Sequence, residues 1–305
     1  MTSVLITGPT RGLGRAATPA LAGHPARPDL LLVGRGGPGL TAVAGDARAR
    51  GARVHTIPAD LSRLADVREA AATVRNLLET GAVRPLSALI GNAGAMSADT
   101  RRASADGHEL TFAVNYLAHA QLIEGLLASL TAPARIVLLG SNTYRANFWR
   151  RLLNVPEAQW RDPVELARPA TGDAHPGMTA SGVAYSNAKL AILYYAHELQ
   201  RRAPAGVGVS VFEPGWMPGT ALGRDAPAGL RAVMRAIARI PGVATPASSG
   251  PILASMALDP KWASLRDGAF VVRGKVTEVH AMAQDRARER RLWDATAELL
   301  SQVRN

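Results

Sequence analysis

The chain has 305 residues, no cysteine, 47% hydrophobic residues and a formal net charge of +11. This length can bury a substantial core, and the lack of cysteine excludes disulfide frameworks, iron–sulfur clusters, thiolate zinc sites and cysteine nucleophiles. The positive charge comes almost entirely from arginines scattered along the chain, without the basic runs or interleaved aromatic residues of a nucleic-acid interface, so we expect no nucleic-acid partner.

Short apolar segments alternate with helical patterns from the N-terminus onward. The predicted strands are uniformly apolar, as strands covered on both faces should be. They are Ser3–Thr7, Asp29–Val33, Arg53–Ile57, Ala88–Ile90, Ile136–Leu139, Val207–Phe212 and Ala269–Val272. The helical patterns span residues 12–22, 40–50, 63–79, 106–130, 185–202, 246–257 and 283–303. This alternation predicts an α/β fold, a Rossmann-like doubly wound parallel sheet of about seven strands with helices on both faces.

Two long loops interrupt the alternation, but no linker divides the chain, so we expect a single domain over residues 1–305. Residues 142–184 contain several prolines and no clean strand, and we predict that they form a substrate-loop insertion. The segment from about residue 213 is predicted to be a C-terminal extension on the substrate side. Residues 1–7 have no basic n-region and their apolar stretch stops at Gly8, which favours a cytoplasmic protein without stable membrane insertion.

The first predicted strand runs directly into a glycine-rich turn, Thr7-Gly8-Pro9-Thr10-Arg11-Gly12-Leu13-Gly14, and a helix follows. Glycines allow the backbone to approach a pyrophosphate closely, and a helix N-terminus offers free N–H groups and a positive dipole. Because this turn lies between the first strand and the first helix of an α/β chain, it indicates a dinucleotide site.

The TGxxxGxG spacing of this turn resembles that of the short-chain dehydrogenase/reductase family, and further motifs follow in the family's order. They are Asp60-Leu61 after the third strand, Asn92-Ala93-Gly94 after the fourth, Asn115 in the next helix, Ser141 after the fifth strand, Tyr185-Ser186-Asn187-Ala188-Lys189, and Pro214-Gly215 with Thr220 after the sixth strand. The match covers nearly the whole chain, which is therefore identified as a member of that family.

The resemblance implies an oxidoreductase that uses a nicotinamide cofactor. Ser141 would hydrogen-bond the substrate carbonyl oxygen, and Tyr185 would give that oxygen a proton as hydride arrives. Lys189 would tune Tyr185 and hold the nicotinamide ribose, and Asn115 would position a water in the proton relay. The residues expected to bind the cofactor are Gly8, Thr10, Arg11, Gly12, Leu13, Gly14, Arg35, Asp60, Leu61, Asn92, Ala93, Gly94, Tyr185, Lys189, Pro214, Gly215 and Thr220. No metal site is expected.

The pairing of Tyr185 with Lys189 also has a chemical reason that needs no family. Lysine occurs only at Lys189, Lys261 and Lys275, so a lysine four residues after a tyrosine at the start of a predicted helix is unusual. This spacing puts both side chains on one helix face. A nearby ammonium favours the phenolate, so we expect Lys189 to move the pKa of Tyr185 from about 10 toward neutral pH.

The end of the second predicted strand decides between the two nicotinamide cofactors. A carboxylate about 20 residues after the glycine turn would bind a ribose 2′-hydroxyl and select NADH. Gly34 occupies that place, Arg35 follows it, and Arg11 lies within the turn. Two arginines near a 2′-phosphate favour NADPH/NADP+ over NADH.

The substrate is less specified by the sequence. Tyr185 lies 44 residues after Ser141, which makes room for the insertion. Tyr144, Trp149 and Trp216 either cover a hydrophobic or aromatic small-molecule substrate beside Ser141 or pack their loops onto the domain. The insertion and the C-terminal helix resemble the branch with retinol-dehydrogenase-like and protochlorophyllide-reductase-like members. Because protochlorophyllide reduction in that branch relies on a cysteine, we exclude that activity and expect reduction of a ketone or aldehyde, or the reverse oxidation of an alcohol.

Other roles remain open at this point. A non-catalytic NADP(H)-binding sensor or partner-binding protein is the alternative, although the intact catalytic motif argues against it. Residues Leu230–Val243 place three arginines on one helical face, which suits either a helix over the substrate cleft or peripheral membrane association, and we prefer the helix. The insertion favours a monomer, with a homodimer as the other option.

Overall fold

The computed structural model describes residues 2–146, 156–172, 177–217 and 243–302. All its strands belong to one eight-stranded sheet with the order β3-β2-β1-β4-β5-β6-β7-β8. The strands are β1 (Ser3–Thr7), β2 (Asp29–Gly34), β3 (Val54–Pro58), β4 (Leu86–Gly91), β5 (Leu130–Leu139), β6 (Val207–Glu213), β7 (Ala269–Val272) and β8 (Lys275–Val276). The first seven pair in parallel, and β8 pairs with β7 in the antiparallel sense. The predicted doubly wound fold is confirmed, with one short edge strand more than expected.

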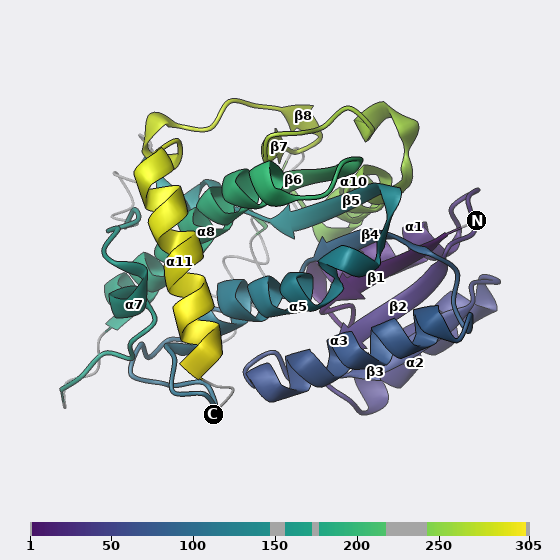
Figure 1. The fold of residues 1–305 in the computed structure, drawn as a ribbon, viewed down its shortest axis with the longest axis horizontal. Coiled ribbons are helices and arrows are strands. Elements are labelled where there is room, and N and C mark those ends of the chain that lie inside the picture. Colours follow the sequence, from purple (N-terminus) through teal and green to yellow (C-terminus); the bar gives the residue numbers. More distant parts are fainter. Residues whose placement is uncertain (1, 147–155, 173–176, 218–242, 303–305) are drawn as a thin grey trace.

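Helices cover both faces of the sheet (Figure 1). Those described are α1 (Gly12–Ala22), α2 (Pro38–Ala49), α3 (Leu64–Glu79), α4 (Leu110–Phe112), α5 (Ala118–Leu126), α7 (Pro163–Leu166), α8 (Gly177–Arg202), α10 (Pro246–Leu258) and α11 (Arg286–Gln302). Neighbouring residues of a strand point to opposite faces. Accordingly, Val4 and Ile6 of β1 pack with α1, α2 and α10, whereas Leu5 packs with α3, α5 and α8.

Two helix predictions differ from the structure. The segment expected to be one helix over 106–130 consists of α4, a π-helical turn (Ala113–Leu117) and α5, which ends at Leu126. The helix predicted to start at Tyr185 is α8, which begins eight residues earlier at Gly177. Hydrophobic periodicity did not detect this start, because the first turns of α8 are mostly polar or small and only partly buried.

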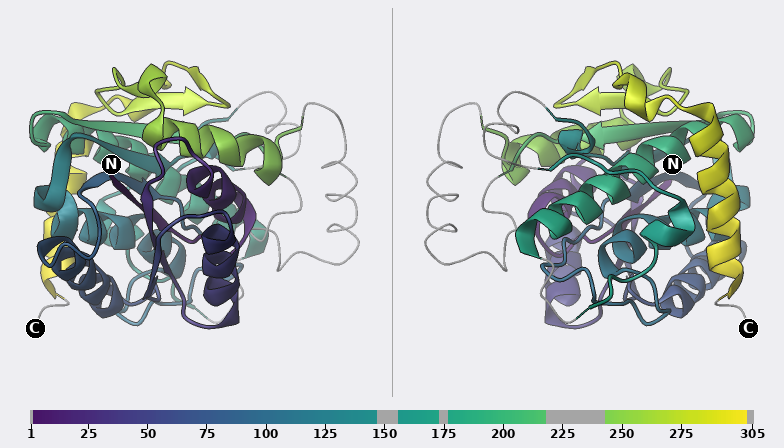
Figure 2. Two further views of the ribbon diagram at one scale, coloured as in Figure 1. Left: turned by 90° about the vertical axis from the view of Figure 1, so that its right-hand side faces the viewer. Right: turned by 90° about the vertical axis from the view of Figure 1, so that its left-hand side faces the viewer.

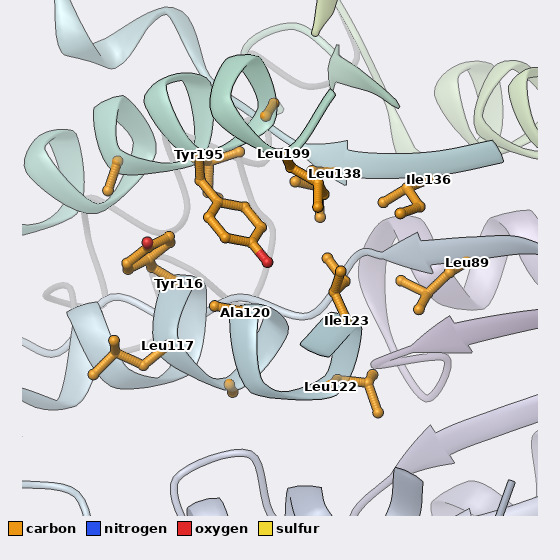
Figure 3. Close-up of a cluster of buried hydrophobic side chains, with 14 of the residues drawn as sticks. Leu89, Tyr116, Leu117, Ala120, Leu122, Ile123, Ile136, Leu138, Tyr195 and Leu199 are labelled. Carbon is orange, nitrogen blue, oxygen red and sulfur yellow. The ribbon is translucent and has the colours of Figure 1, made fainter. Parts of the chain in front are cut away.

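The larger core cluster lies between α5, α8 and strands β4 and β5 (Figure 3). Tyr195 of α8 points toward the π-helical turn and α5, and its ring meets that of Tyr116 in the π-helical turn edge-on at a centroid distance of 5.5 Å. Leu138 of β5 and Ile123 of α5 fill the space beside them. This cluster fixes α8 against the sheet and thereby sets the position of its active-site residues.

The C-terminal helix α11 lies along the outer side of α8 (Figures 1 and 2). Trp293 of α11 stacks on Tyr195 with a centroid distance of 5.5 Å and an interplanar angle of 13°. The guanidinium of Arg202 lies 4.8 Å from the Trp293 ring centroid. Helix α7 of the insertion also contacts α11, where the Arg291 guanidinium pairs with Asp162 at 2.7 Å. Within the described residues, no helix combines the length and apolar character that crossing a membrane would require.

Candidate active site

The glycine turn joins β1 to α1 at the carboxyl edge of the sheet. Gly8 has a φ of +64°, which favours glycine, and a Cβ there would lie 3.0 Å from Ala93. At Gly14 a Cβ would lie 2.3 Å from the Gly8 carbonyl oxygen and 2.5 Å from Nδ2 of Asn92. These glycines therefore allow the turn, the start of α1 and the Asn92 segment to pack against one another.

A cavity of about 750 Å³ opens beside this turn. The N-terminus of α1 lies at its wall, and the residue before the helix, Arg11, makes no side-chain capping bond, so the first helical N–H groups can serve a ligand. Most residues predicted to bind the cofactor line this cavity: Gly8, Thr10, Arg11, Gly12, Leu13, Arg35, Asp60, Leu61, Asn92, Ala93, Gly94, Tyr185, Lys189 and Pro214. Gly14 and Gly215 are absent from the wall, and Thr220 lies outside the described residues.

The cavity wall also contains residues that the motifs did not indicate. They are Ala59, Ser62, Ala95, Met96, Ser97, Arg102, Ala103, Leu110, Val114, Leu139, Gly140 and Met217. Gly34, at the position that a cofactor-selecting carboxylate would occupy, lies in the wall as well. Arg102 is placed there by its loop, because the Ala105 N–H donates to the Ser62 carbonyl at 3.0 Å. Ala95, Met96 and Ser97 directly follow Asn92-Ala93-Gly94, and that adjacency was the available signal. The position of Arg102 had no comparable local signal.

Tyr185 and Lys189 lie on the cavity side of α8, one turn apart. Nζ of Lys189 is 5.5 Å from the Tyr185 ring centroid and donates a 2.8 Å hydrogen bond to the Leu139 carbonyl. Burial lowers the pKa of Lys189 to about 7. The expected lowering of the Tyr185 pKa is wrong for this structure: burial and then the charge of Glu213 raise it above its ordinary value. Burial and the charge of Glu213 are the two causes of this shift, and Lys189 is not one of them.

Glu213 is a charged residue near Tyr185 that no sequence motif indicated. It ends β6 and is only 6% exposed. Its carboxylate accepts hydrogen bonds from the Gly215 N–H at 3.1 Å and from Nδ2 of Asn142 at 3.4 Å. Burial raises the pKa of Glu213, and these bonds and the charge of Arg273 oppose the shift. The carboxylate thus joins the ends of β5 and β6 beside Tyr185.

Ser141 follows Gly140 at the end of β5 and caps a short 3₁₀ turn (Asn142–Tyr144). Its Oγ accepts a hydrogen bond from the Thr143 N–H at 3.3 Å. Among the described residues, no hydrogen bond joins the hydroxyl groups of Ser141 and Tyr185. Gly140, the residue before Ser141, lines the cavity together with Tyr185, whereas Ser141 itself is not part of the wall.

Asn115 is fully buried within the π-helical turn. Its Nδ2 donates to the carbonyl oxygens of Ala95 and Thr111 at 2.6 and 2.7 Å, which directs Oδ1 the other way. Oδ1 has no hydrogen-bond partner in the described structure. A Cβ at Gly94 would lie 2.8 Å from this oxygen and 3.9 Å from Nζ of Lys189, so both polar atoms face the space at Gly94. An unpaired buried acceptor beside a lysine suits a bound water or ligand.

The aromatic residues predicted to contact substrate lie in different environments in the structure. Tyr144 is fully buried in the core, and its hydroxyl accepts a 3.0 Å hydrogen bond from the His280 N–H. That prediction is wrong, because the side chain is packed inside the protein and does not line the cavity. Trp216 is 59% exposed, between the cavity-lining residues Pro214 and Met217. Trp149 lies outside the described residues, as does the segment 230–242.

This chain is similar to known proteins over most of its length. Residues 2–149 match the family model for short chain dehydrogenases. A Streptomyces sp. (strain C5) protein named as a daunorubicin C-13 ketoreductase is 31% identical over 297 residues, which cover 97% of this chain and 91% of the relative. Human retinol dehydrogenase 13 is 30% identical over 227 residues, 73% of this chain and 60% of that protein.

Solved structures show the same fold. A short chain dehydrogenase from Burkholderia cenocepacia, crystallised in complex with NADP, superposes with a TM-score of 0.63. The superposition covers 90% of this chain and 97% of that one at 24% sequence identity.

Proposed function

The chain belongs to the short-chain dehydrogenase family, in its retinol-dehydrogenase-like branch, and we propose that it is an NADPH-dependent carbonyl reductase. It would reduce a ketone or aldehyde of a hydrophobic or aromatic small molecule, or oxidise the corresponding alcohol. The observation that carries this proposal is the shared cavity: Tyr185 and Lys189 line the same space as the glycine turn and the N-terminus of α1.

The residues present fit a nicotinamide cofactor. The uncapped start of α1 and the close-packed glycines suit a pyrophosphate, and Asn115 and Lys189 direct polar atoms to the space at Gly94. When bound, the cofactor would supply hydride. Tyr185, held protonated by burial and by Glu213, would donate a proton to the substrate oxygen. Lys189 and Asn115 would hold the water from which Tyr185 recovers its proton, and Ser141 would orient the oxygen.

The preference for NADPH rests on the cationic side chains of the cavity wall. Arg11, Arg35 and Arg102 all line it, and β2 ends in Gly34 without a carboxylate. Arginine pairs strongly with phosphate oxygens, whereas a ribose hydroxyl needs an acidic partner. The wall near Met96, Leu110 and Val114 is apolar, which suits a hydrophobic substrate. The relative named as a daunorubicin C-13 ketoreductase supports a ketone as the reacting group.

We further propose that the protein is a cytoplasmic monomer with one domain, in which the segment from residue 213 covers the substrate side. Helices α11 and α7 occupy the outer side of α8, and Trp293 stacks on Tyr195 there. A second subunit would have to displace these contacts. Light scattering on a gel-filtration column should give a mass near 32 kDa, and a mass twice as large would contradict this part of the proposal.

The deciding experiment follows NADPH absorbance while a panel of aromatic and aliphatic ketones and aldehydes is screened. Tyr185→Phe should bind NADPH but lose at least about 100-fold in kcat, because general acid catalysis contributes about that much. Tyr194→Phe is the matched control on the same helix, since its hydroxyl bonds the Met282 carbonyl away from the cavity. NADPH binding without turnover of any compound would favour the sensor alternative instead.

A further inference from the structure

His119 is a buried, uncharged hydrogen-bonding side chain that the proposed chemistry does not use. It lies in the first turn of α5, directly after the π-helical turn, and is 3% exposed. Nδ1 is 3.0 Å from the backbone carbonyl oxygen of Asn115, and Nε2 is 3.0 Å from the Thr7 hydroxyl. The ring therefore bridges the π-turn and the end of β1, which are far apart in the sequence.

The protons of this bridge can be assigned from its partners. A carbonyl oxygen only accepts, so Nδ1 must carry a proton and donate it to Asn115. Burial, and to a lesser extent the charge of Lys189, lowers the pKa of His119 to about 4, so the ring is neutral at pH 7. Nε2 is then an acceptor and receives the Thr7 O–H. The Thr7 oxygen in turn accepts the Ala93 N–H at 2.9 Å. Every donor has one acceptor in this chain.

We propose that His119 is a positioning residue, which holds the backbone of Asn115 through Nδ1 and the segments carrying Thr7 and Ala93 through Nε2. The proposal rests on the proposed function, in which Asn115 serves the proton relay and Ala93 adjoins the cofactor. Thr7, Asn115 and His119 are all almost fully buried, so water cannot replace a lost partner easily.

The packing around the ring explains why its position is restricted. A Cβ at Gly91 would lie 3.1 Å from Cδ2 of His119, so the imidazole lies close against the end of β4. Asn115 donates both Nδ2 protons to the Ala95 and Thr111 carbonyl oxygens. Its Oδ1, which has no hydrogen-bond partner among the described residues, faces Gly94 and Lys189. A displacement of the Asn115 backbone would therefore move the one side-chain atom available to the relay.

Two amide variants separate the two links. In His119→Asn the amide nitrogen can take the place of Nδ1 and keep the bond to Asn115, but the side chain is too short to reach Thr7. In His119→Gln the amide oxygen can take the place of Nε2 and accept the Thr7 hydroxyl, but the donor to Asn115 is lost. We expect His119→Gln to lower kcat about 10-fold or more with little change in the Kd for NADPH, and His119→Asn to raise that Kd several-fold while retaining most of kcat.

If both variants lowered kcat equally and raised the Kd for NADPH equally, the proposal would be overturned, since a residue that only fills space would behave in this way. Wild-type activity in both variants would overturn it as well.

A measurement independent of turnover uses nitrogen NMR of the wild-type protein with labelled histidine. The proposal requires His119 to show the Nδ1-protonated neutral tautomer between pH 5.5 and 8, a range chosen to lie above its pKa of about 4. A proton on Nε2, or titration near pH 6.5, would refute the assignment. This result stands whether or not a carbonyl substrate is found, so it distinguishes failure of the bridge from failure of the proposed function.

Discussion

The ammonium of Lys189 donates a hydrogen bond to the carbonyl oxygen of Leu139, 2.8 Å away at the end of β5. This bond connects α8, which carries Tyr185, to the strand that leads into Ser141. The bond holds the end of a lysine side chain that is only 4% exposed. The two halves of the candidate catalytic machinery are therefore linked through a buried lysine side chain.

The buried position of Lys189 predicts a pH dependence of stability. Its pKa is about 7 in the folded protein and 10.5 in the unfolded chain, so the unfolded chain binds more protons between these values. The contribution of Lys189 to the free energy of unfolding should rise with pH across this window, by at most about 1.4 kcal/mol per pH unit. Urea unfolding of wild type and Lys189→Met from pH 6.5 to 10 would measure it. If the difference in the free energy of unfolding between wild type and Lys189→Met stayed constant across this pH range, the lowered pKa of Lys189 would be contradicted.

The carboxylate of Glu213 should hold the pKa of Tyr185 high. In Glu213→Gln the amide oxygen can still accept the bonds from Gly215 and Asn142, but the negative charge is gone. The pKa of Tyr185 should fall, because its phenolate is no longer repelled. Reduction needs protonated Tyr185, so the alkaline loss of kcat should begin at lower pH than in wild type. An unchanged alkaline limb would show that Glu213 has no electrostatic effect there.

Arg35 should contribute to the choice of cofactor. Arg35→Ser removes a cation from the cavity wall and should raise KM for NADPH about 10- to 100-fold, with little effect on KM for NADH. Arg290→Ser, an exposed change on α11, is the control for loss of one positive charge. Equal effects of Arg35→Ser on both cofactors would argue against contact with a 2′-phosphate.

Gly94 should tolerate no side chain. Gly94→Ala places a Cβ 2.8 Å from Oδ1 of Asn115, so we expect kcat to fall at least about 10-fold. Gly45→Ala is the matched change in an open, helical position of α2, with nothing within 4 Å of the new Cβ. It should raise the free energy of unfolding by about 0.5–1 kcal/mol and leave activity unchanged. Wild-type turnover in Gly94→Ala would mean that catalysis does not depend on the position of the Asn115 side chain.

Trp293 should stabilise the packing of α11 against α8. Trp293→Ala removes the stacking on Tyr195 and the contact with Arg202, and should lower the free energy of unfolding by about 2–3 kcal/mol. Trp216→Ala, at a site 59% exposed, should change it by less than about 0.5 kcal/mol. Denaturant unfolding of both variants tests the comparison, and similar losses would show that α11 packs only weakly.

Features that depend on short spacing can be predicted from the sequence alone. The glycine turn follows β1 with a positive φ at residue 8, a conformation that favours glycine. Tyr185 and Lys189 face one side of α8 because four residues make about one helical turn. The alternation of apolar strands and helices was sufficient for the doubly wound sheet, although the weakly periodic start of α8 was missed.

The residues that surround these motifs come from distant parts of the chain, and their positions depend on the tertiary fold. Glu213 lies close enough to Tyr185 to raise its pKa, His119 bonds Thr7, and the loop of Arg102 is held at Ser62. Tyr144, an aromatic residue in a loop, proved to be buried rather than at the cavity. No local pattern encodes such contacts, because they arise when packing of both sheet faces brings the carboxyl ends of separate strands together.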